Sequence, residues 1–462
     1  MENNQPTKLY TIVADICFVI LSVIFLIYPA LYNGYPLLYT DSATYVISGH
    51  ELNIPIDRPV FYGLFVWISS FSYSLWLVVI IQALFVVGLV YYTYSLFFQS
   101  FHKTLYAFFT IVTMSLFTGL PNYVSQIMPD IFTGILVWLV ILFFFSKSAV
   151  SKGVILAGIL LSTIVHNSNM MTLSLMIGLI LLTSLIFKKA KIVKSGLILG
   201  AWSVFIWLLV PTLNYSIEKE WYVSKSGSIF LIGKMIQTGV VKDYLEEECP
   251  NNNYELCRFK DSLPQYSYEF YWNANSPLYY GNCGDTGGWS NCWKVKSAEY
   301  KKIIFGVLKK PDLLYRYTVI SVKDAFRQIF YFDMIHFIPL GGEGSAFDSI
   351  LGKYFKDFPM FKRSIQYSQQ ISYEARNLIQ RVFIAITAVL SLVFLFVKLF
   401  KAETKYKMMA LWLLAGFAIN AALCSTFSIV EGRFQGRLVW LVPLFFGLLL
   451  ANYLENRKMR NE

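Results

Sequence analysis

The sequence is poor in charge: only 15% of its 462 residues are charged, whereas 56% are hydrophobic. Soluble domains contain a smaller fraction of apolar residues. Repeated long apolar stretches are typical of membrane-spanning helices. Phosphate-binding loops of the Gly-x-Gly-x-x-Gly and Walker A types are missing, as are internal repeats and low-complexity tracts. The composition therefore predicts an all-α polytopic membrane protein with no nucleotide site of these types.

Cysteine is also scarce, and four of the six cysteines fall in one polar loop, at Cys249, Cys257, Cys283 and Cys292. They lack the paired Cys-x-x-Cys spacing of zinc sites, so disulfides are the favoured interpretation and zinc is the alternative. Four cysteines allow three pairings. Because short loops close at least entropic cost, we expect Cys249–Cys257 and Cys283–Cys292. Disulfides would place the loop in an oxidising compartment.

The net charge of +11 lacks the arrangement that a nucleic-acid-binding surface needs. Outside the apolar segments there is no basic stripe interleaved with aromatic residues. Basic residues gather instead in short connections between apolar segments, the pattern that marks the cytoplasmic side of a membrane protein. Membrane lipids are therefore expected partners, and nucleic acid is not.

Ten spans are predicted, at roughly 10–31, 74–98, 104–120, 130–146, 153–167, 170–187, 195–213, 378–400, 408–427 and 438–454. The first lacks a small-residue cleavage site and is expected to be retained. Lysines concentrate in alternate connections and in the C-terminal tail, which places both termini in the cytoplasm. The cysteine loop then lies outside, as disulfides require. A bacterial inner membrane with a periplasmic outer face fits this topology.

Three regions follow from this topology. Residues 1–213 form an N-terminal membrane module with a first exterior loop at 32–73, and residues 378–462 form the C-terminal membrane helices. Residues 214–377 are too long for a plain connection, and their basic and acidic residues nearly balance, which predicts a small exterior domain. Within it, Tyr300–Leu308 and Pro311–Phe332 are predicted to be amphipathic helices against the membrane face.

Polar residues of the membrane region converge on the predicted outer face. They are Asp41, Tyr45, Glu51, Asp57 and Arg58 in the first loop, Asp130 at the head of the fourth span, His166 between the fifth and sixth spans, and Glu431, Arg433 and Arg437 before the last span. Each can serve a structural purpose, with the exception of Asp41. This lone carboxylate among aromatic residues has no obvious structural task.

The structural alternatives are specific. A helix cap would explain Asp130, because free N–H groups and the helix dipole favour an anion there. Asp57 and Arg58 would form a local ion pair within the loop. His166 would be a hydrogen-bonded interfacial residue, and Arg433 and Arg437 would bind lipid headgroups. Glu51 would be a solvated loop charge.

Four stretches resemble the GT-C glycosyltransferases, which are membrane enzymes that use polyprenyl-phosphate-linked sugars: Tyr39–Tyr45, Arg58–Gly63, Met128–Gly134 and Gly432–Arg437. The resemblance implies that Asp41 is the principal catalytic carboxylate and that Asp130 is the acidic residue of the second exterior loop. The chain lacks the paired Asp-x-Asp of metal-dependent members. It is more similar to the aminoarabinose and protein O-mannosyl transferases and to O-antigen-modifying glucosyltransferases. No cofactor is expected, and a divalent metal stays an alternative.

The chemistry of sugar transfer fits these residues. A positioned aspartate, Asp41, can act as the general base that takes the acceptor proton. Arginine binds phosphate bidentately, so Arg437, Arg433 and Arg58 are the candidate ligands of the donor phosphate. Substrate-binding candidates are Asp57, Tyr45, His166 and Glu431. The predicted reaction moves a sugar, with inversion, from a polyprenyl-phosphate donor to a glycan, lipid or protein acceptor.

Two other function classes stay open. A lipid-linked polysaccharide polymerase or O-antigen ligase would also have many spans, a large exterior loop and essential arginines, but it would not need the aspartate after the first span. A transporter would have charged or helix-breaking residues in mid-span on repeated halves. The spans here are free of such residues, and the charges gather at one face.

Overall fold

The structure is a computed structural model that describes residues 8–99, 102–186, 188–281, 283, 288–334, 346–368, 371–397, 400 and 402–461. Within these ranges the chain is helical, and its extended pairing amounts to one isolated parallel bridge between Leu37 and Gln126. The predicted all-α class is therefore confirmed.

The helices, in chain order, are α1 (Lys8–Asn33), α2 (Ser42–Glu51), α3 (Phe61–Ser70), α4 (Leu75–Phe97), α5 (Lys103–Phe117), α6 (Leu120–Ser125), α7 (Asp130–Phe145), α8 (Ala149–Ile164), α9 (Asn167–Ile186), α10 (Ala190–Glu218), α11 (Gly227–Gln237), α12 (Val240–Glu248), η1 (Glu255–Phe259), α13 (Ser267–Trp272), η2 (Pro277–Tyr279), α14 (Gly288–Lys309), α15 (Pro311–Phe330), α16 (Ala346–Tyr354), α17 (Phe358–Phe361), α18 (Glu374–Phe396), α19 (Thr404–Phe427), α20 (Gly432–Val439) and α21 (Leu441–Asn461).

In the described part of the chain, seven helices are long and apolar enough to cross a membrane: α1, α4, α9, α10, α18, α19 and the span that α20 and α21 form together. The other three predicted spans coincide with α5, α7 and α8, which have only 15 or 16 residues. A helix needs about 20 residues to cross the hydrocarbon core of a bilayer of ordinary thickness. The chain is thus a helical membrane protein, and the count of ten stays a prediction.

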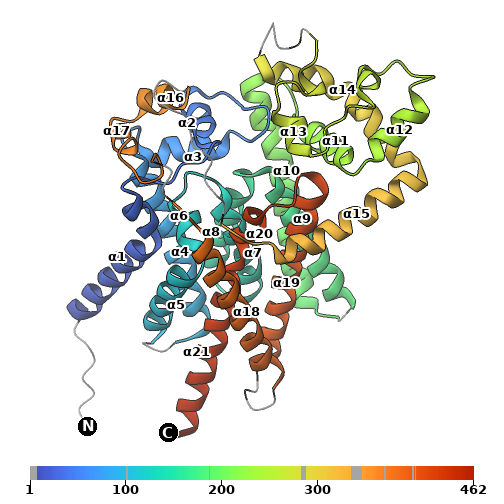
Figure 1. Ribbon diagram of the computed structural model, residues 1–462. Helices are drawn as coiled ribbons and strands as arrows, with labels where there is room; N and C mark the ends of the chain where they lie inside the picture. The colour runs from blue at the N-terminus through green and yellow to red at the C-terminus, as the bar shows by residue number, and fades with distance from the viewer. Residues whose placement is uncertain are drawn as a thin grey trace.

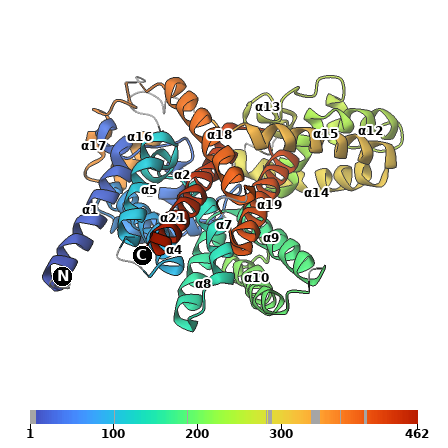
Figure 2. The same cartoon turned by 90° about the horizontal axis from the view of Figure 1, so that it is seen from below.

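Helix α7 is the centre of the membrane bundle, as the view along the helices shows (Figure 2). All of its residues from Asp130 to Phe143 are buried. A helix that is apolar on every side can face lipid or other helices, and the burial of α7 shows that other helices surround it. Gly134 allows the closest approach: a Cβ there would lie 2.7 Å from the Trp440 ring and 2.8 Å from the Arg437 carbonyl oxygen.

Helix α1 begins and helix α21 ends at one end of the bundle, and the polar helices lie at the other end (Figure 1). There, α2 and α3 adjoin α16 and α17, and a separate group of helices, α11 to α15, forms a second body. The predicted outer-face residues therefore all belong to the end of the bundle that carries the disulfides.

The α11–α15 body has its own hydrophobic core, built from residues between Ile229 and Tyr317. Two disulfides join Cys249 to Cys257 and Cys283 to Cys292, so the predicted pairing is confirmed. The two amphipathic helices predicted here correspond to α14 and α15.

Residues 346–368 pack elsewhere, although they belong to the same predicted exterior region. The backbone N–H of Gln366 donates to Asn33 Oδ1 at 2.7 Å. Its side-chain Oε1 accepts from Leu38 N at 3.0 Å, and its Nε2 donates to Leu38 O at 2.6 Å. Leu351, Phe355 and other residues of this segment join the core of the membrane bundle. Residues of the region 214–377 thus contribute to two parts of the structure: the disulfide-bonded body and the packing around the first exterior loop.

Candidate active site

Extended backbone fixes the first exterior loop beside the head of α7. Leu37 N donates to Ser125 O, and Ile127 N donates to Leu37 O, each at 2.9 Å. The Ser42 hydroxyl donates to Ile127 O at 2.9 Å and accepts from Tyr39 N at 2.8 Å. These bonds tie the segment that carries Asp41 to the segment that ends at Asp130.

A close helix pair supports the same loop from the other side. Helices α2 and α3 touch backbone to backbone, since a Cβ at Gly49 would lie 2.0 Å from the Gly63 carbonyl oxygen. The Tyr45 ring meets the Tyr62 ring edge-on, with centroids 4.8 Å apart. Both rings are buried, so the pair forms a rigid base under the loop.

Gln82, a buried amide in α4, connects this base to the end of α6 and to the segment that leads into α7. It accepts from the Tyr62 hydroxyl at 2.9 Å and donates to the carbonyl oxygens of Val124 and Gln126 at 2.8 and 3.0 Å. Gln82 was not among the residues predicted from the sequence. The available signal was an amide inside an apolar span, where polar side chains are costly and usually have a partner.

Asp41, Arg58 and Asp57 form one ionic network. Arg58 Nε donates to Asp57 Oδ1 at 3.0 Å, its Nη2 pairs with Asp57 Oδ2, and its Nη1 lies 3.0 Å from Asp41 Oδ2. The Asp57 side chain is 3% exposed, whereas that of Asp41 is 26% exposed. The predicted local pair between Asp57 and Arg58 is therefore present, and Asp41 is the member that faces outward.

The charges of Asp41 and Asp57 stabilise the charged form of Arg58. Burial by itself would lower the pKa of Arg58, but Asp41 and Asp57 raise it well above its usual value. The guanidinium also lies over the Tyr45 ring, 5.1 Å from its centroid. Asp41 Oδ1 has no hydrogen bond or ion pair within the described ranges. An acceptor hydroxyl can therefore reach this oxygen while Arg58 holds the other.

Asp130 and Arg437 form a second, closed network. Arg437 Nη1 donates to Asp130 Oδ1 at 3.2 Å, and the two side chains are 0% and 3% exposed respectively. Arg437 Nη2 donates to Asn420 Oδ1 at 2.9 Å and contacts Cys424 Sγ at 3.6 Å. Asp130 is the first residue of α7, where the helix dipole favours an anion, and its side chain accepts a hydrogen bond from Arg437.

Asn420 extends this closed network to the backbone of α20. Its amide donates to Phe434 O at 2.7 Å and to Gln435 Oε1 at 2.9 Å. On the outer side, the Gln328 amide bonds the backbone of Glu431 in both directions, each at 2.8 Å. Asn420 and Gln328 were also missed from the sequence. Together they fix the segment between Glu431 and Arg437 against α19 and α15.

Arg433 differs from the other two arginines because it makes no ion pair with a carboxylate among the described residues, although the charges of Asp130, Glu431 and Asp41 act on it. Its guanidinium lies over the rings of Tyr39 and Phe434, 4.8 and 5.1 Å from their centroids. Nε and Nη1 are both shielded from water, and neither has a hydrogen-bond partner among the described residues. Buried donors without acceptors are costly, and a bound anion would satisfy them.

The pKa of the Tyr39 hydroxyl depends on charges of both networks. Its pKa is raised to about 12 because the hydroxyl is buried; Arg433 opposes this shift, and Glu431, Asp41 and Asp130 add to it. The same ring is the one beneath Arg433 and stands two residues before Asp41. Tyr39 therefore lies within electrostatic range of Asp41, Asp130, Glu431 and Arg433.

His166 lies in the turn between α8 and α9, at the edge of the same field. Its Nδ1 is 2.8 Å from the Ser168 hydroxyl, as the interfacial hydrogen-bonded alternative predicted. Burial lowers its pKa well below the usual value, and Arg437, Arg433 and Arg58 lower it further, against the attraction of Asp41. The imidazole is therefore neutral near pH 7.

Acidification is expected to destabilise the protein through His166. The pKa is lower in the folded state than in the unfolded chain, so below about pH 6.5 the unfolded chain binds a proton that the folded protein refuses. Stability should then fall as the pH drops. The melting temperature of wild type should decrease more steeply between about pH 7.5 and about pH 5.5 than that of His166→Gln. Identical slopes would contradict this assignment.

Among the described residues, no group of three or more His, Cys, Asp or Glu side chains is placed to hold a metal ion. The three aspartates of the site are instead paired with arginine. Asp41 and Asp57 share Arg58, and Asp130 pairs with Arg437.

The predicted site residues thus come together as two ionic networks, with Arg433 beside them, at the N-terminal end of α7. Asp41, Asp57, Arg58 and Tyr45 form the first network, and Asp130 and Arg437 form the second. Arg433, Glu431 and His166 lie within the field of both. Comparisons of the chain with protein-family models, with curated proteins and with solved structures return no match, so its family is not identified and function must be argued from this site.

Proposed function

We propose that the protein is a membrane glycosyltransferase of the GT-C type. It moves a sugar from a polyprenyl-phosphate donor to a glycan, lipid or protein acceptor at the outer face of the membrane in which it lies. The observation that carries the proposal is that a hydrogen-bond acceptor and hydrogen-bond donors, each without a partner, lie near Tyr39. Asp41 offers a carboxylate oxygen without a partner, and Arg433 offers two N–H groups without an acceptor. A base and an anion-binding cation are what this reaction requires.

In the proposed reaction, Asp41 takes the proton of the acceptor hydroxyl as its oxygen attacks the anomeric carbon of the sugar. The bond between that carbon and the phosphate oxygen breaks, and the phosphate leaves with the electron pair. Arg433 holds the developing charge on the phosphate through its two N–H groups. Attack from the face opposite the phosphate gives inversion. The donor is already activated, so the reaction needs no nucleotide.

The three arginines take different roles in this proposal, although the sequence placed all of them at the phosphate. Arg58 orients Asp41, and Tyr45 and Asp57 hold Arg58 in place. Arg437 anchors α20 on Asp130 and so positions Arg433 one helical turn away. Glu431 and His166 stay candidates for binding the acceptor or the sugar.

Specific features favour transfer over the alternatives. A polymerase or ligase would use the arginines but would leave the Asp41–Arg58 arrangement without a task. A transporter would place its charges in mid-span, whereas Asp130 and Arg437 pair at the end of α7 where the outer-face segments meet. The cluster of charges at one end of the bundle supports chemistry at that face.

The proposed topology has ten spans with both termini in the cytoplasm of a bacterium and the site in the periplasm. Helix α1 begins and helix α21 ends at the same end of the bundle, which requires an even number of crossings, and α5, α7 and α8 added to the seven long spans give ten. Short helices can span where neighbours surround them and the bilayer thins.

Reporter fusions test this topology. Fusions at Lys191 and at Asn253 should report opposite compartments, with Lys191 in the cytoplasm, because lysines concentrate at the first position and disulfides lie near the second. The same compartment at both positions would refute the topology and the outer-face site together.

Arg433→Lys tests the phosphate assignment. Lysine keeps the charge but loses the planar fork, so binding of undecaprenyl phosphate to the purified protein should weaken by about tenfold or more. Arg381→Lys is the matched control, since Arg381 is an exposed arginine at the outer end of α18 that pairs with Asp333. Wild-type affinity in Arg433→Lys would move the phosphate site elsewhere.

A further inference from the structure

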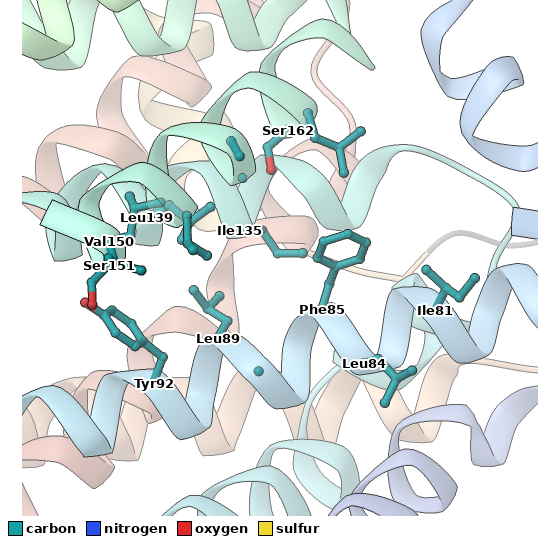
Figure 3. Close-up of a pocket in the computed structure, with 16 residues that line it drawn as sticks. Ile81, Leu84, Phe85, Leu89, Tyr92, Ile135, Leu139, Val150, Ser151 and Ser162 are labelled. Atoms are coloured by element: carbon teal, nitrogen blue, oxygen red, sulfur yellow. The ribbon is translucent and has the colours of Figure 1, made fainter. Parts of the chain in front are cut away.

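A cavity of about 780 Å³ lies between α4, α7 and α8 (Figure 3). Its lining is mainly apolar: Phe85 and Leu89 of α4 face Ile135 of α7 across it, and the lining contains no charged residue. A hydroxylated acceptor in this cavity would lose its hydrogen bonds to water and gain few replacements. The cavity is therefore unsuited to a sugar.

Helix α13 presents a different kind of surface on the exterior body, made of exposed aromatic rings. Tyr266, Tyr268 and Trp272 are 47, 52 and 52% exposed. The rings of Tyr266 and Tyr268 lie nearly parallel, with their centroids 5.5 Å apart and their planes 17° apart. Trp272 follows Tyr268 by four residues, which is one helical turn, on the same side of α13. These three residues are called the aromatic platform below.

The helix that carries the aromatic platform is held rigidly. Gly233 of α11 lies so close to α13 that an added Cβ would be 2.2 Å from the Tyr271 ring. Ser267 donates to Gln237 Oε1 through its backbone N–H at 3.1 Å and through its hydroxyl at 2.7 Å. Because α13 is already ordered, a ligand that binds to the platform would have little of the protein to immobilise.

The residues around the aromatic platform indicate the class of ligand. The structure describes all of residues 258–275, and beside the three rings they expose polar side chains and one alanine: Arg258, Asp261, Ser262, Gln265, Asn273, Ala274 and Asn275. A pyranose has a face of C–H groups, which packs against the electron-rich face of an aromatic ring, and hydroxyl groups at its edge, which need donors and acceptors. Aromatic rings bordered by amides and hydroxyls therefore suit a sugar.

The lipid-facing surface of the same chain has another composition. The exposed apolar residues of the spanning helix α18 are mainly aliphatic, for example Leu378, Val382 and Val389. Within residues 258–275, no aliphatic side chain larger than that of Ala274 is exposed. The platform therefore does not resemble a surface that faces hydrocarbon.

Tyr279 connects the aromatic platform to the candidate active site. Its hydroxyl donates to the carbonyl oxygen of Tyr271, the residue before Trp272, and accepts from Trp293 Nε1 at 3.1 Å. Burial raises the pKa of Tyr279, the hydrogen bond from Trp293 opposes this shift, and the Asp57 carboxylate adds to it. The base of the platform therefore lies within electrostatic range of the ionic network that contains Asp41.

Packing joins the same two parts of the molecule. Ile56, which directly precedes Asp57 in the first exterior loop, packs against the hydrophobic core of the exterior body. Within that body, α13 lies at the end nearer to α2, and α12 lies at the far end (Figures 1 and 2). A chain that lies on the platform is thus beside the loop that carries Asp57 and Arg58.

We propose that the aromatic platform binds the glycan chain of the acceptor and holds it beside the loop that carries Asp57 and Arg58. The inference rests on the proposed function and selects a glycan from the three acceptor classes named there. One aromatic ring has about the area of one pyranose, so three rings contact two or more consecutive sugar units. The acceptor is therefore an oligosaccharide or a polysaccharide and not a single sugar.

Two alanine variants remove the stacking surface. Tyr268→Ala combined with Trp272→Ala removes two of the three rings, whereas Tyr268→Phe keeps the ring and loses only the hydroxyl. Tyr266→Ala combined with Tyr268→Ala leaves the contact of Trp272 with the buried Trp293 intact and serves if the first variant folds poorly. Tyr315→Ala is the matched control, because Tyr315 is a 71% exposed tyrosine on α15, outside the platform.

The probe is polysaccharide from an envelope extract, freed of lipid by mild acid and labelled with a fluorophore, and its binding to the purified full-length protein is followed by fluorescence anisotropy. Wild type, Tyr268→Phe and Tyr315→Ala should bind it with affinities within about twofold, and both alanine double variants should bind it at least about tenfold more weakly. Polysaccharide hydrolysed completely to monosaccharides should not compete. Undecaprenyl phosphate should bind all of these proteins equally, because Arg433 is unchanged.

Each other outcome has a defined meaning. Wild-type affinity for the polysaccharide in both double variants would remove the platform from glycan binding and leave the proposed function standing. If the double variants also changed a wild-type dimer to a monomer, the platform would be a contact between copies of the chain. A wild type that binds undecaprenyl phosphate but no polysaccharide would refute the glycan acceptor alone. Failure of wild type to bind undecaprenyl phosphate would instead contradict the proposed function.

Discussion

Asp41→Asn is expected to reduce sugar transfer by about 100-fold or more while the protein still folds and binds its donor. Asparagine keeps the shape of the side chain and can still meet Arg58, but it cannot take a proton from the acceptor. Arg58 keeps both contacts with Asp57, so the network loses one ion pair and not its anchor. Initial rates at saturating donor, together with undecaprenyl phosphate binding, measure the two effects separately.

The structural alternative for Asp41 makes the reverse prediction. If the carboxylate only stabilises the loop, Asp41→Asn should express poorly, and the folded fraction should transfer sugar normally. Asp312→Asn serves as the control for the chemical change, since Asp312 is an exposed aspartate in the first turn of α15. A well-folded Asp41→Asn protein with the wild-type rate would remove Asp41 from the mechanism.

Arg437→Ala is expected to destabilise the protein by about 3–5 kcal/mol, the scale for breaking a buried ion pair. The substitution would leave the Asp130 carboxylate buried beside α7 without a counter-charge, and Asn420 would lose the N–H that it accepts. Denaturant titration of the purified protein in detergent measures the loss.

A double variant separates charge from packing at this pair. Asp130→Asn with Arg437→Gln removes both charges and keeps hydrogen-bonding groups, so it should be much more stable than Arg437→Ala alone. Arg437→Lys retains the charge and should bind undecaprenyl phosphate almost normally once folded, in contrast to Arg433→Lys. If Arg437→Ala were as stable as wild type, the pair would not anchor α20, and Arg437 would return as a phosphate ligand.

Local features of this chain were predictable from the sequence because they depend on neighbouring residues. The two disulfides close loops of eight and nine residues, so proximity sufficed to choose among three pairings. The ion pair between Asp57 and Arg58 joins adjacent residues. Apolar segment length predicted ten helices, and each of the ten is a helix in the structure, although three of them are shorter than a typical span.

Long-range contacts decided what the sequence could not. Arg433 and Arg437 are one turn apart and chemically identical, and the positions of Asp130 and Asn420, distant in the chain, give Arg437 its partners and leave Arg433 without an ion pair among the described residues. The return of Gln366 to Asn33 and Leu38 likewise joins segments more than 300 residues apart. No spacing rule anticipates such contacts.

The most direct measurement of the central claim is a transfer assay with the purified protein and polyprenyl-phosphate donors whose sugar is radiolabelled. Envelope extract supplies the acceptor, and both label transfer and release of free polyprenyl phosphate are followed. The proposed function predicts that, for one donor of the panel, wild type moves the label into the acceptor and releases the lipid phosphate, and that Asp41→Asn does neither. Label that stays on the lipid with every donor, in wild type and variant alike, would contradict it.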